Sequence, residues 1–442
     1  MTAGVWLAGA LTGACQQPVS FSSDIAPILI AKCQTCHGAD KPKGKYQLHT
    51  FELLLKPGTS GEPPIVAGQP EKSPFHQLLV ETDPDNRMPQ KDDPLPPAQI
   101  ALVARWIKEG ARFDGPDPKA TLASLVPKAP HPEPPASYPF PVPVTALAFH
   151  PQRSELAVSG YHEVTVWQAE QGRLLRRIQG LPRQIHSLAF SPDGALLAVA
   201  GGSPGRSGEL ALVDFASGTV KQVLLALNDV LLATAISSDG KLLAAAGSDN
   251  TIHLLDLPSG RKRPATAQHA DWIMALAFSP DGRHIATASR DRTSRVFETA
   301  TLELDATYAG HDSAVMAVAF SADGKSLASA GRDKKIGLRS SSDGSKASTI
   351  TGFEGDILKL LAVGEHILSA GADKVIRVHK LHDRSLVRTL EGHTDWVYAL
   401  AADSKGSVLA SGSHDGEVRL WNLADGTLLK SFKAAPGLVA VK

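Results

Sequence analysis

Cysteine is rare in this 442-residue chain, which contains only three. Cys33 and Cys36 belong to one motif and Cys15 stands apart, so we expect no internal disulfide framework. An excess of charge is missing too, because 45 lysine and arginine residues balance 45 aspartate and glutamate residues. This balance gives no general attraction to nucleic acid, which is therefore not expected as a partner.

The apolar stretch at the start of the sequence is too short to span a bilayer. Residues 1–14 are uncharged and mostly small or apolar, which is typical of a secretion signal. We therefore expect residues 1–20 to be an export signal or lipoprotein-type leader, and the protein to reach the periplasm or cell envelope. Leu11-Thr12-Gly13-Ala14-Cys15 is similar to a bacterial lipoprotein cleavage site, and membrane association is expected only if Cys15 is lipidated.

The motif Cys33-Gln34-Thr35-Cys36-His37-Gly38 has the fewest possible interpretations. Two cysteines at i and i+3 followed by histidine form the attachment signature of c-type haem, in which both thiols become thioethers and the histidine ligates iron. On a helix the three side chains share one face, so all can reach one flat macrocycle. The motif predicts one covalently attached haem c, with Cys33 and Cys36 as covalent sites and His37 as proximal iron ligand.

Two other kinds of site have similar spacing. A structural zinc site needs a fourth ligand, usually from a second cysteine or histidine pair, and the only further cysteine is Cys15. A thioredoxin-like redox pair needs a strand, helix, strand context that the sequence around Cys33 does not have. An unmodified thiol pair remains the alternative to haem.

Apolar residues at helical spacing flank the motif on both sides. Residues 21–30 predict a first helix, which Ser23 or Asp24 can cap. Residues 98–107 predict an amphipathic helix that packs against the first one. Short helices are expected at 51–55 and 74–80.

The iron of such a haem needs a sixth ligand or an open site. Met88 is the best candidate, because it is the only methionine that follows the motif within this domain and prolines on both sides stiffen its loop. Methionine also fills hydrophobic cores, so the residue type alone is weak support. His76 and His49 are the alternatives.

These residues resemble the small cytochrome c domain of planctomycetes and related bacteria. The matching segments are Asp24-Ile25-Ala26-Pro27-Ile28-Leu29, the haem motif, Lys43-Gly44, Gly68-Gln69-Pro70-Glu71-Lys72-Ser73, Arg87-Met88-Pro89 and Trp106-Ile107-Lys108-Glu109-Gly110-Ala111. The resemblance implies a small all-α haem domain over residues 21–113, with His37 as proximal and Met88 as distal iron ligand. One departure is Gln90, where the family usually has a second proline.

Residues 114–141 are predicted to be a proline-rich linker. Ten prolines fall between Pro116 and Pro143, and few apolar residues accompany them. Such a segment favours extended polyproline geometry and acts as a semi-rigid spacer. His131 lies in it and is expected to be solvated.

Residues 142–442 contain internal repeats. Blocks of the type Ala275-Leu276-Ala277-Phe278 recur seven times at spacings of 39 to 46 residues. Each predicts a short buried strand, followed by a turn such as Ser279-Pro280-Asp281-Gly282 and further strands, because Asp-Gly pairs favour hairpins. The blocks begin at Ala146, Ser187, Ala233, Ala275, Ala317, Leu360 and Ala399.

The repeats are similar to WD40 repeats, which implies an all-β propeller with seven blades over residues 142–442. The family's Trp-Asp pair occurs only as Trp421-Asn422, so the blades are degenerate at that position. The predicted fold is therefore multidomain, with a small all-α cytochrome c-like domain followed by a seven-bladed propeller. The propeller is expected to serve as a platform for protein–protein interaction.

Histidine and aspartate are separated by 22 residues three times in the repeats. The pairs are His269 and Asp291, His311 and Asp333, and His393 and Asp415. Recurrence indicates a structural hydrogen bond between a loop and the adjacent hairpin rather than catalysis, and we assign no catalytic residue.

Three functions fit these features. The first is an exported monohaem c-type cytochrome that passes single electrons to an unknown redox protein, more an electron carrier than an enzyme. The second is a haem enzyme or ligand sensor, which needs a displaceable sixth ligand. The third is a scaffold in which the haem is structural.

Overall fold

The described part of the chain falls into two compact units, residues 1–129 and 130–442. The computed structural model describes residues 18–38, 42–90, 93–115, 117–125, 131–341 and 347–438. Cys15 and most of the predicted leader lie outside these residues. No helix within the described ranges combines the length and the apolar character that a membrane crossing needs.

The first unit is helical. Its elements are η1 (Phe21–Ile25), α1 (Ala26–Lys32), α2 (Gln34–His37), η2 (Lys43–Lys45), α3 (Phe51–Leu54), η3 (Pro70–Lys72), α4 (Pro74–Val80), α5 (Pro97–Lys108) and α6 (Leu122–Leu125). The cap of the first helix differs from the prediction. Ser20 Oγ accepts the Ser23 amide at 3.0 Å, and the Asp24 carboxylate accepts the Ser20 amide at 2.9 Å, so Ser20 is the capping residue.

Aromatic rings form the core between η1 and α5. The Phe21 ring lies 5.5 Å from that of Trp106 and 4.8 Å from that of Phe51, measured between centroids. Phe21 and Trp106 are fully buried, and the Trp106 indole donates to the Arg112 carbonyl at 3.0 Å. The predicted packing of the first helix against the helix over 98–107 is therefore confirmed.

The proline-rich stretch packs against protein at both of its described ends. Leu122 is fully buried in the first unit, and its amide donates to the His49 carbonyl at 2.9 Å. In the second unit, His131 Nε2 lies 3.1 Å from both carboxylate oxygens of the buried Glu209. The prediction that His131 is solvated is wrong, because a buried carboxylate needs a hydrogen-bond partner.

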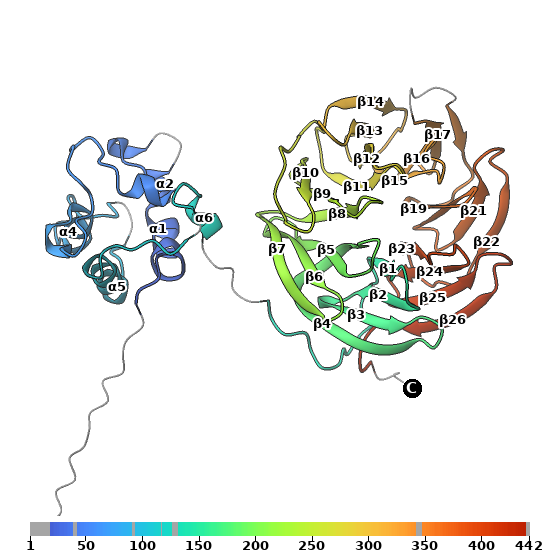
Figure 1. The fold of residues 1–442 in the computed structure, drawn as a ribbon, viewed down its shortest axis with the longest axis horizontal. Coiled ribbons are helices and arrows are strands. Elements are labelled where there is room, and N and C mark those ends of the chain that lie inside the picture. Colours follow the sequence, from blue (N-terminus) through green and yellow to red (C-terminus); the bar gives the residue numbers. More distant parts are fainter. Residues whose placement is uncertain are drawn as a thin grey trace, which may run out of the picture. The chain divides into compact units, whose positions relative to one another are not determined.

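The second unit is a β-propeller of six hydrogen-bonded sheets (Figure 1). One sheet holds β1 (Leu147–Phe149), β2 (Glu155–Ser159), β3 (Tyr161–Gln168), β4 (Arg173–Phe190), β5 (Leu196–Ser203), β6 (Ser207–Asp214) and β7 (Thr219–Leu227). The next holds β8 (Leu231–Ile236), β9 (Leu242–Gly247) and β10 (Ile252–Asp256).

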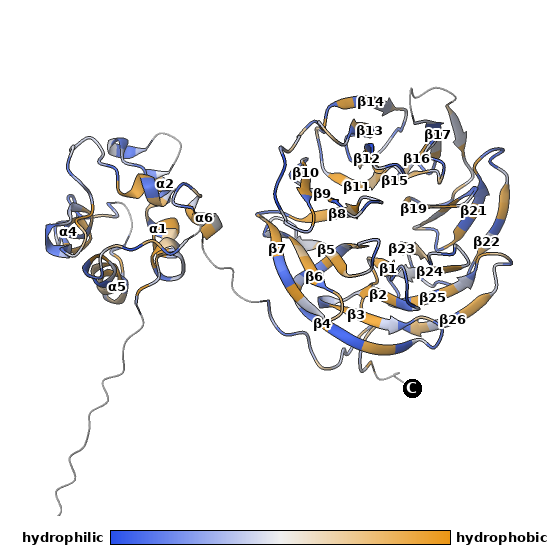
Figure 2. Cartoon of the chain, in the orientation of Figure 1, coloured by the Kyte–Doolittle hydropathy of each residue, from blue (hydrophilic) through white to orange (hydrophobic). Residues whose placement is uncertain are grey.

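Four further sheets have four antiparallel strands each. They are β11 (Ile273–Phe278) with β12 (His284–Ser289), β13 (Thr293–Glu298) and β14 (Leu304–Ala309); β15 (Val315–Phe320) with β16 (Ser326–Gly331), β17 (Ile336–Ser340) and β18 (Ser348–Ile350); β19 (Ile357–Val363) with β20 (His366–Gly371), β21 (Ile376–Lys380) and β22 (Leu386–Leu390); and β23 (Val397–Ala402) with β24 (Val408–Ser413), β25 (Glu417–Asn422) and β26 (Leu428–Lys433). Hydrophobic residues concentrate on inner strands such as β8 and β11 (Figure 2), as expected where neighbouring sheets pack.

The number of separate blades differs from the prediction of seven. Five sheets are separate blades of three or four strands, and the first two sequence repeats share the seven-stranded sheet. They are joined because β4 is continuous: Arg177 in its first half pairs with Thr165 of β3, and Leu188 in its second half pairs with Val199 of β5. Pro182 lies in the middle of β4, where it has no backbone N–H to donate to a neighbouring strand.

The ring closes without a strand borrowed from the start of the propeller. The last sheet is formed entirely by β23 to β26, and β1 lies beside β23 (Figure 1). The Val144 amide donates to the Ser413 carbonyl at 3.0 Å, and the rings of Trp167 and Phe432 lie 4.6 Å apart. Hydrophobic packing between the first and last sheets therefore replaces a shared strand.

Residues 131–143, here called the closing segment, reinforce this junction. Its Tyr138 hydroxyl donates to Glu163 Oε1 at 2.6 Å, and its Tyr138 amide donates to the Pro436 carbonyl at 3.2 Å. Glu163 is completely buried and also pairs with Arg177, whose Nη2 reaches the Pro135 carbonyl at 2.7 Å. One buried carboxylate thus connects the closing segment, β3 and β4.

Candidate functional site

The four predicted haem residues lie on the wall of one cavity in the first unit. Cys33, Cys36, His37 and Met88 all line this cavity of about 620 Å³, a size within the roughly 300–1,000 Å³ of ligand pockets. Much of the remaining wall is apolar. It includes Ala31, Leu48, Pro64, Phe75, Leu78 and Leu79.

One ring nitrogen of His37 is engaged in a hydrogen bond to the backbone. It ends the short helix α2, and its Nδ1 lies 3.2 Å from the Tyr46 carbonyl oxygen. A carbonyl only accepts, so Nδ1 carries the proton and donates it to Tyr46, which leaves Nε2 as the nitrogen that can ligate a metal. The Tyr46 ring also lies edge-on to the imidazole at 5.4 Å.

The Tyr46 carbonyl is itself fixed by its surroundings. The Tyr46 hydroxyl donates to the Leu54 carbonyl at 2.8 Å, and burial strongly raises the pKa of this hydroxyl. The neighbouring Gly44 carbonyl accepts from the Thr59 amide at 2.8 Å and from the Thr59 hydroxyl at 2.6 Å. A Cβ on Gly58 would lie 2.7 Å from that carbonyl, so only glycine permits this approach of the two loops.

Met88 lies on the cavity wall, whereas the two alternative ligands do not. The Met88 amide donates to the Leu78 carbonyl at 2.9 Å, which ties its loop to α4. Neither His76 nor His49 lines the cavity. The position therefore favours Met88 among the three candidates, and its role as iron ligand stays a prediction.

The thiols do not have the character of a redox pair. Burial, and then the nearby Cys36, raise the pKa of the Cys33 thiol to about 12, whereas disulfide-exchange cysteines have lowered pKa values. The zinc alternative also lacks support. Cys33, Cys36 and His37 do not belong to any cluster of three ligand atoms within 4.8 Å among the residues that the structure describes.

The donor set fits a c-type haem. Two thiols could form thioethers, His37 Nε2 and the Met88 thioether could serve as iron ligands, and apolar walls suit a macrocycle. No pattern in the sequence indicates Tyr46 as the partner of His37. A backbone carbonyl carries no side-chain identity, so only the fold reveals it.

The recurring histidines of the propeller form the predicted structural hydrogen bonds. His269 Nδ1 lies 2.8 Å from Asp291, His311 Nδ1 lies 2.8 Å from Asp333, and His393 Nδ1 lies 3.3 Å from Asp415. Each Nε2 meets a strand hydroxyl at 2.7 or 2.8 Å; the hydroxyls belong to Thr287, Ser329 and Ser411. Every imidazole is therefore used on both sides.

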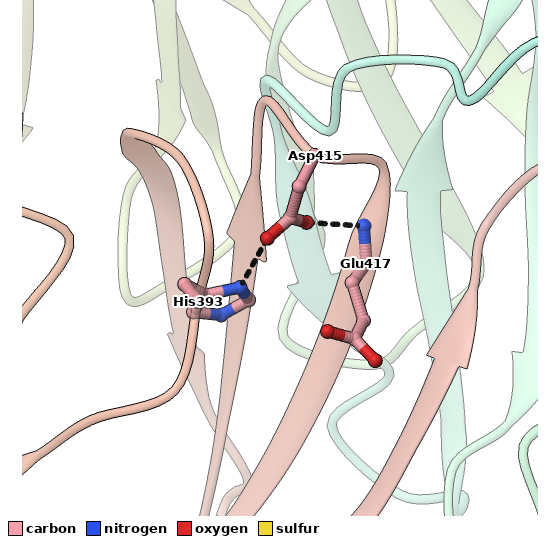
Figure 3. Close-up of side chains that lie close together, drawn as sticks. All are labelled: His393, Asp415 and Glu417. Carbon is pink, nitrogen blue, oxygen red and sulfur yellow. Dashed lines mark hydrogen bonds and ion pairs between the residues drawn. The ribbon is translucent and has the colours of Figure 1, made fainter.

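One of these groups has the outline of a metal site. Ligand atoms of His393, Asp415 and Glu417 lie within 4.8 Å of one another. Figure 3 shows the three side chains close together, with Asp415 between the His393 ring and the Glu417 amide. Their lone pairs already have partners, because Asp415 Oδ1 accepts the Glu417 amide at 2.8 Å and Glu417 accepts from Arg419 at 3.0 Å. Trp421 donates to Ser411 at 2.9 Å, which completes a chain from indole to carboxylate. The group is structural rather than a cation site.

Asp291 and Asp415 are stabilised as carboxylates, because hydrogen bonds lower their pKa values. Burial alone would raise the pKa of Asp291, but hydrogen bonds from Thr293, His269 and the Ala270 amide lower it to about 2. Burial lowers the pKa of His269, although Asp291 opposes this effect. A neutral histidine that donates to an ionised aspartate is a stable arrangement and leaves no reactive group.

Comparison with known proteins finds family matches in both parts of the chain. Residues 33–92 match a family described as planctomycete cytochrome C. Residues 227–256, 262–298, 302–338 and 384–422 match the WD domain, G-beta repeat.

Curated relatives match only within short segments. The small ribosomal subunit protein RACK1z of Arabidopsis thaliana is 50% identical over 46 residues, which is 10% of this chain and 14% of the relative. The target of rapamycin complex subunit wat1 of Schizosaccharomyces pombe is 35% identical over 115 residues, which is 24% of this chain and 34% of the relative. The chain thus spans about a third of the length of one relative and less of the other, and their activities do not transfer to it.

Proposed function

The chain joins a planctomycete-type cytochrome c domain to a WD40-repeat propeller, and we propose that it is an exported monohaem c-type cytochrome that transfers single electrons. The observation that carries this proposal is the cavity of the first unit. It brings together Cys33, Cys36, His37 and Met88, which are separated by up to 55 residues in the sequence. A domain of this family implies haem c.

The residues of the cavity have separate roles in this proposal. Cys33 and Cys36 attach one haem covalently, His37 Nε2 is the proximal ligand and Met88 the distal ligand. When bound, the haem supplies reversible one-electron chemistry. The chain would hold the His37 proton at Nδ1 against Tyr46, exclude water with the buried Leu48 and Leu79, and keep a thioether available, which favours ferrous iron and a raised potential.

The propeller acts as the interaction platform for a redox protein. Two curated relatives of the chain are named as a ribosomal subunit protein and as a subunit of a complex, so both belong to larger assemblies. We count the ring as seven repeats, with the seven-stranded sheet serving as two blades that share β4. Rigid sheets with loops at both ends suit this role.

Export is part of the proposal because of residues 1–14, whose composition is typical of a secretion signal. Cys15 would anchor the protein if it is lipidated. Treatment of the native cell envelope with detergent or with high salt distinguishes a lipid anchor from a soluble exported protein.

The central experiment is spectroscopy of the full chain produced with haem maturation. We expect an intact mass that includes one haem after denaturation, and a ferric spectrum with the methionine-to-iron charge-transfer band. Met88→Ala should lose this band, whereas the matched His76→Ala should keep it. A high-spin five-coordinate spectrum would instead indicate an open site, and a colourless protein with free thiols would exclude haem.

A further inference from the structure

The loop that carries Met88 is closed by its own side chains. Asp83 Oδ1 accepts the Asp85 amide at 3.0 Å, and Asp83 Oδ2 accepts Asn86 Nδ2 at 2.7 Å. The Asp83 carbonyl accepts the amides of Asn86 at 3.1 Å and Arg87 at 2.8 Å. This network fixes the turn that leads into Met88.

Gln90 completes the loop from the other side of Met88. Its Nε2 donates to the Asp85 carbonyl at 3.2 Å, so the side chain after the ligand returns to the turn before it. Gln90, Pro89 and Met88 all line the haem cavity. The Met88 amide is tied to Leu78 of α4, which gives the closed loop one attachment to the body of the unit.

We propose that Asp83 and Gln90 are positioning residues that hold the Met88 sulfur toward the cavity and set how easily an external ligand displaces it. The inference rests on the proposed function, because it assumes that Met88 is the sixth ligand. Met88 itself has a flexible side chain with three rotatable bonds. Its direction therefore depends on the backbone of residues 83–90, and the hydrogen bonds of Asp83 and Gln90 restrict that backbone from both sides.

A structural role alone would give a different result from a positioning role. Both side chains are exposed and neither belongs to the hydrophobic core of the unit. Their loss should leave the fold intact and should act on the ligand loop. The readout must therefore report the bond to Met88 rather than the stability of the unit.

The test is a titration of the ferric full chain with imidazole, followed through the methionine-to-iron charge-transfer band. Gln90→Glu keeps the size of the side chain but removes the N–H donor, so the imidazole concentration that displaces half of Met88 should fall about two- to tenfold. Asp83→Ala removes two bonds to a charged acceptor and should lower that concentration further, by about tenfold or more.

Gln77→Glu is the matched control. Gln77 is an exposed glutamine of the same unit, and its Nε2 donates to the Glu71 carbonyl at 2.9 Å, but it lies in α4 outside the loop. It should leave the titration unchanged. If the band is present in the wild type and Gln90→Glu and Asp83→Ala titrate like the control, the positioning inference is wrong and the proposed function stands. If the wild type shows no such band, the assignment of Met88 fails and the inference fails with it.

Discussion

The two units use hydrogen bonds in different ways. In the propeller, one arrangement of histidine, aspartate and hydroxyl occurs three times, and each copy stabilises its own sheet. In the cytochrome c unit, the support of His37 by Tyr46 and the closure of the Met88 loop by Gln90 each occur once. A hydrogen bond that recurs in several sheets stabilises the fold, whereas a hydrogen bond that occurs once supports one particular site.

This difference separates structural from functional clusters. His393, Asp415 and Glu417 satisfy the geometric outline of a metal site, yet a histidine bonded to an aspartate and to a strand hydroxyl recurs in two other sheets. Cys33, Cys36, His37 and Met88 recur nowhere and meet at a cavity. Recurrence therefore carries information that the local geometry of one cluster does not.

The largest effect on stability is expected at the junction between the first and last sheets, where the propeller has contacts that the other sheets do not repeat. Glu163 is completely buried and binds Arg177 and Tyr138 at the ring junction. Glu163→Ala leaves the largely buried Arg177 without its only carboxylate partner among the described residues, which should lower the free energy of unfolding by about 3–5 kcal/mol. Urea unfolding of the full chain, followed by tryptophan fluorescence, measures this loss.

Glu170→Ala is the control for that substitution. Glu170 is exposed and accepts only the Ser154 hydroxyl, at 3.1 Å. Its removal should change the free energy of unfolding by less than about 0.5 kcal/mol. Equal effects of the two substitutions would contradict the role of Glu163 in closing the ring.

An intermediate effect is expected for one of the repeated bonds. His269→Ala removes a buried side chain that bonds Asp291 and Thr287, so each sheet that loses its histidine should lose about 1–3 kcal/mol. His311 belongs to the next sheet and has its own partners. The double substitution should therefore give the sum of the single effects within about 0.5 kcal/mol. A clear departure from additivity would show that the repeats are coupled.

The sequence predicted the repeated features better than the unique ones. The spacing of 22 residues was sufficient to predict the bonds of His269, His311 and His393, because a periodic pair marks the same place in each sheet. Their hydroxyl partners were missed, since serine and threonine are common in every strand. The continuity of β4 was also missed, because the repeat spacing does not show that the chain pairing with β3 through Gln179 continues into the chain that pairs with β5 from Gln184.

The haem motif and the helices of the first unit were also readable, because Cys33, Cys36 and His37 have a fixed spacing and α5 has a regular apolar face. The proline content of residues 114–141 suggested a spacer, but composition does not record where a chain finds partners. Glu209 and Glu163 lie far from that stretch in the sequence and provide them. A polar contact between two single residues far apart in the sequence has no periodicity or fixed spacing, so the sequence alone does not predict it.

A smaller effect is expected for the support of His37. Tyr46→Phe removes the hydroxyl that donates to the Leu54 carbonyl, which should cost about 0.5–1.5 kcal/mol in the first unit. The Tyr46 carbonyl that binds His37 is retained, so the ferric spectrum should stay the same while amides of residues 42–60 exchange hydrogen faster. Loss of the methionine-to-iron charge-transfer band would mean that the Tyr46 hydroxyl, and not only the Tyr46 carbonyl, is needed for the ligation of the iron.

The smallest effect concerns a repeat that differs from the others in its first turn. His150 Nδ1 accepts the amides of Gln152 and Arg153 at 3.1 Å, which requires an unprotonated nitrogen. Burial, and then the nearby Arg153, lower its pKa below the ordinary value of 6.5; Glu155 opposes this shift, and Arg176 adds to it. The stability that the neutral ring provides is present above about pH 6.5 and is lost as the pH falls toward the lowered pKa.

His150→Asn tests this pH dependence, because an asparagine oxygen can accept the same amides without titrating between pH 7 and pH 5. The wild type should lose more free energy of unfolding over that interval than the variant does, while His414→Asn, an exposed histidine of the last sheet, should behave like the wild type. Parallel pH profiles for all three proteins would show that the turn does not depend on a neutral His150. Unequal profiles would identify His150 as a titrating residue of the first repeat. Other repeats have a serine at this place, such as Ser191 with Asp193, and close the turn with a hydroxyl and a carboxylate instead.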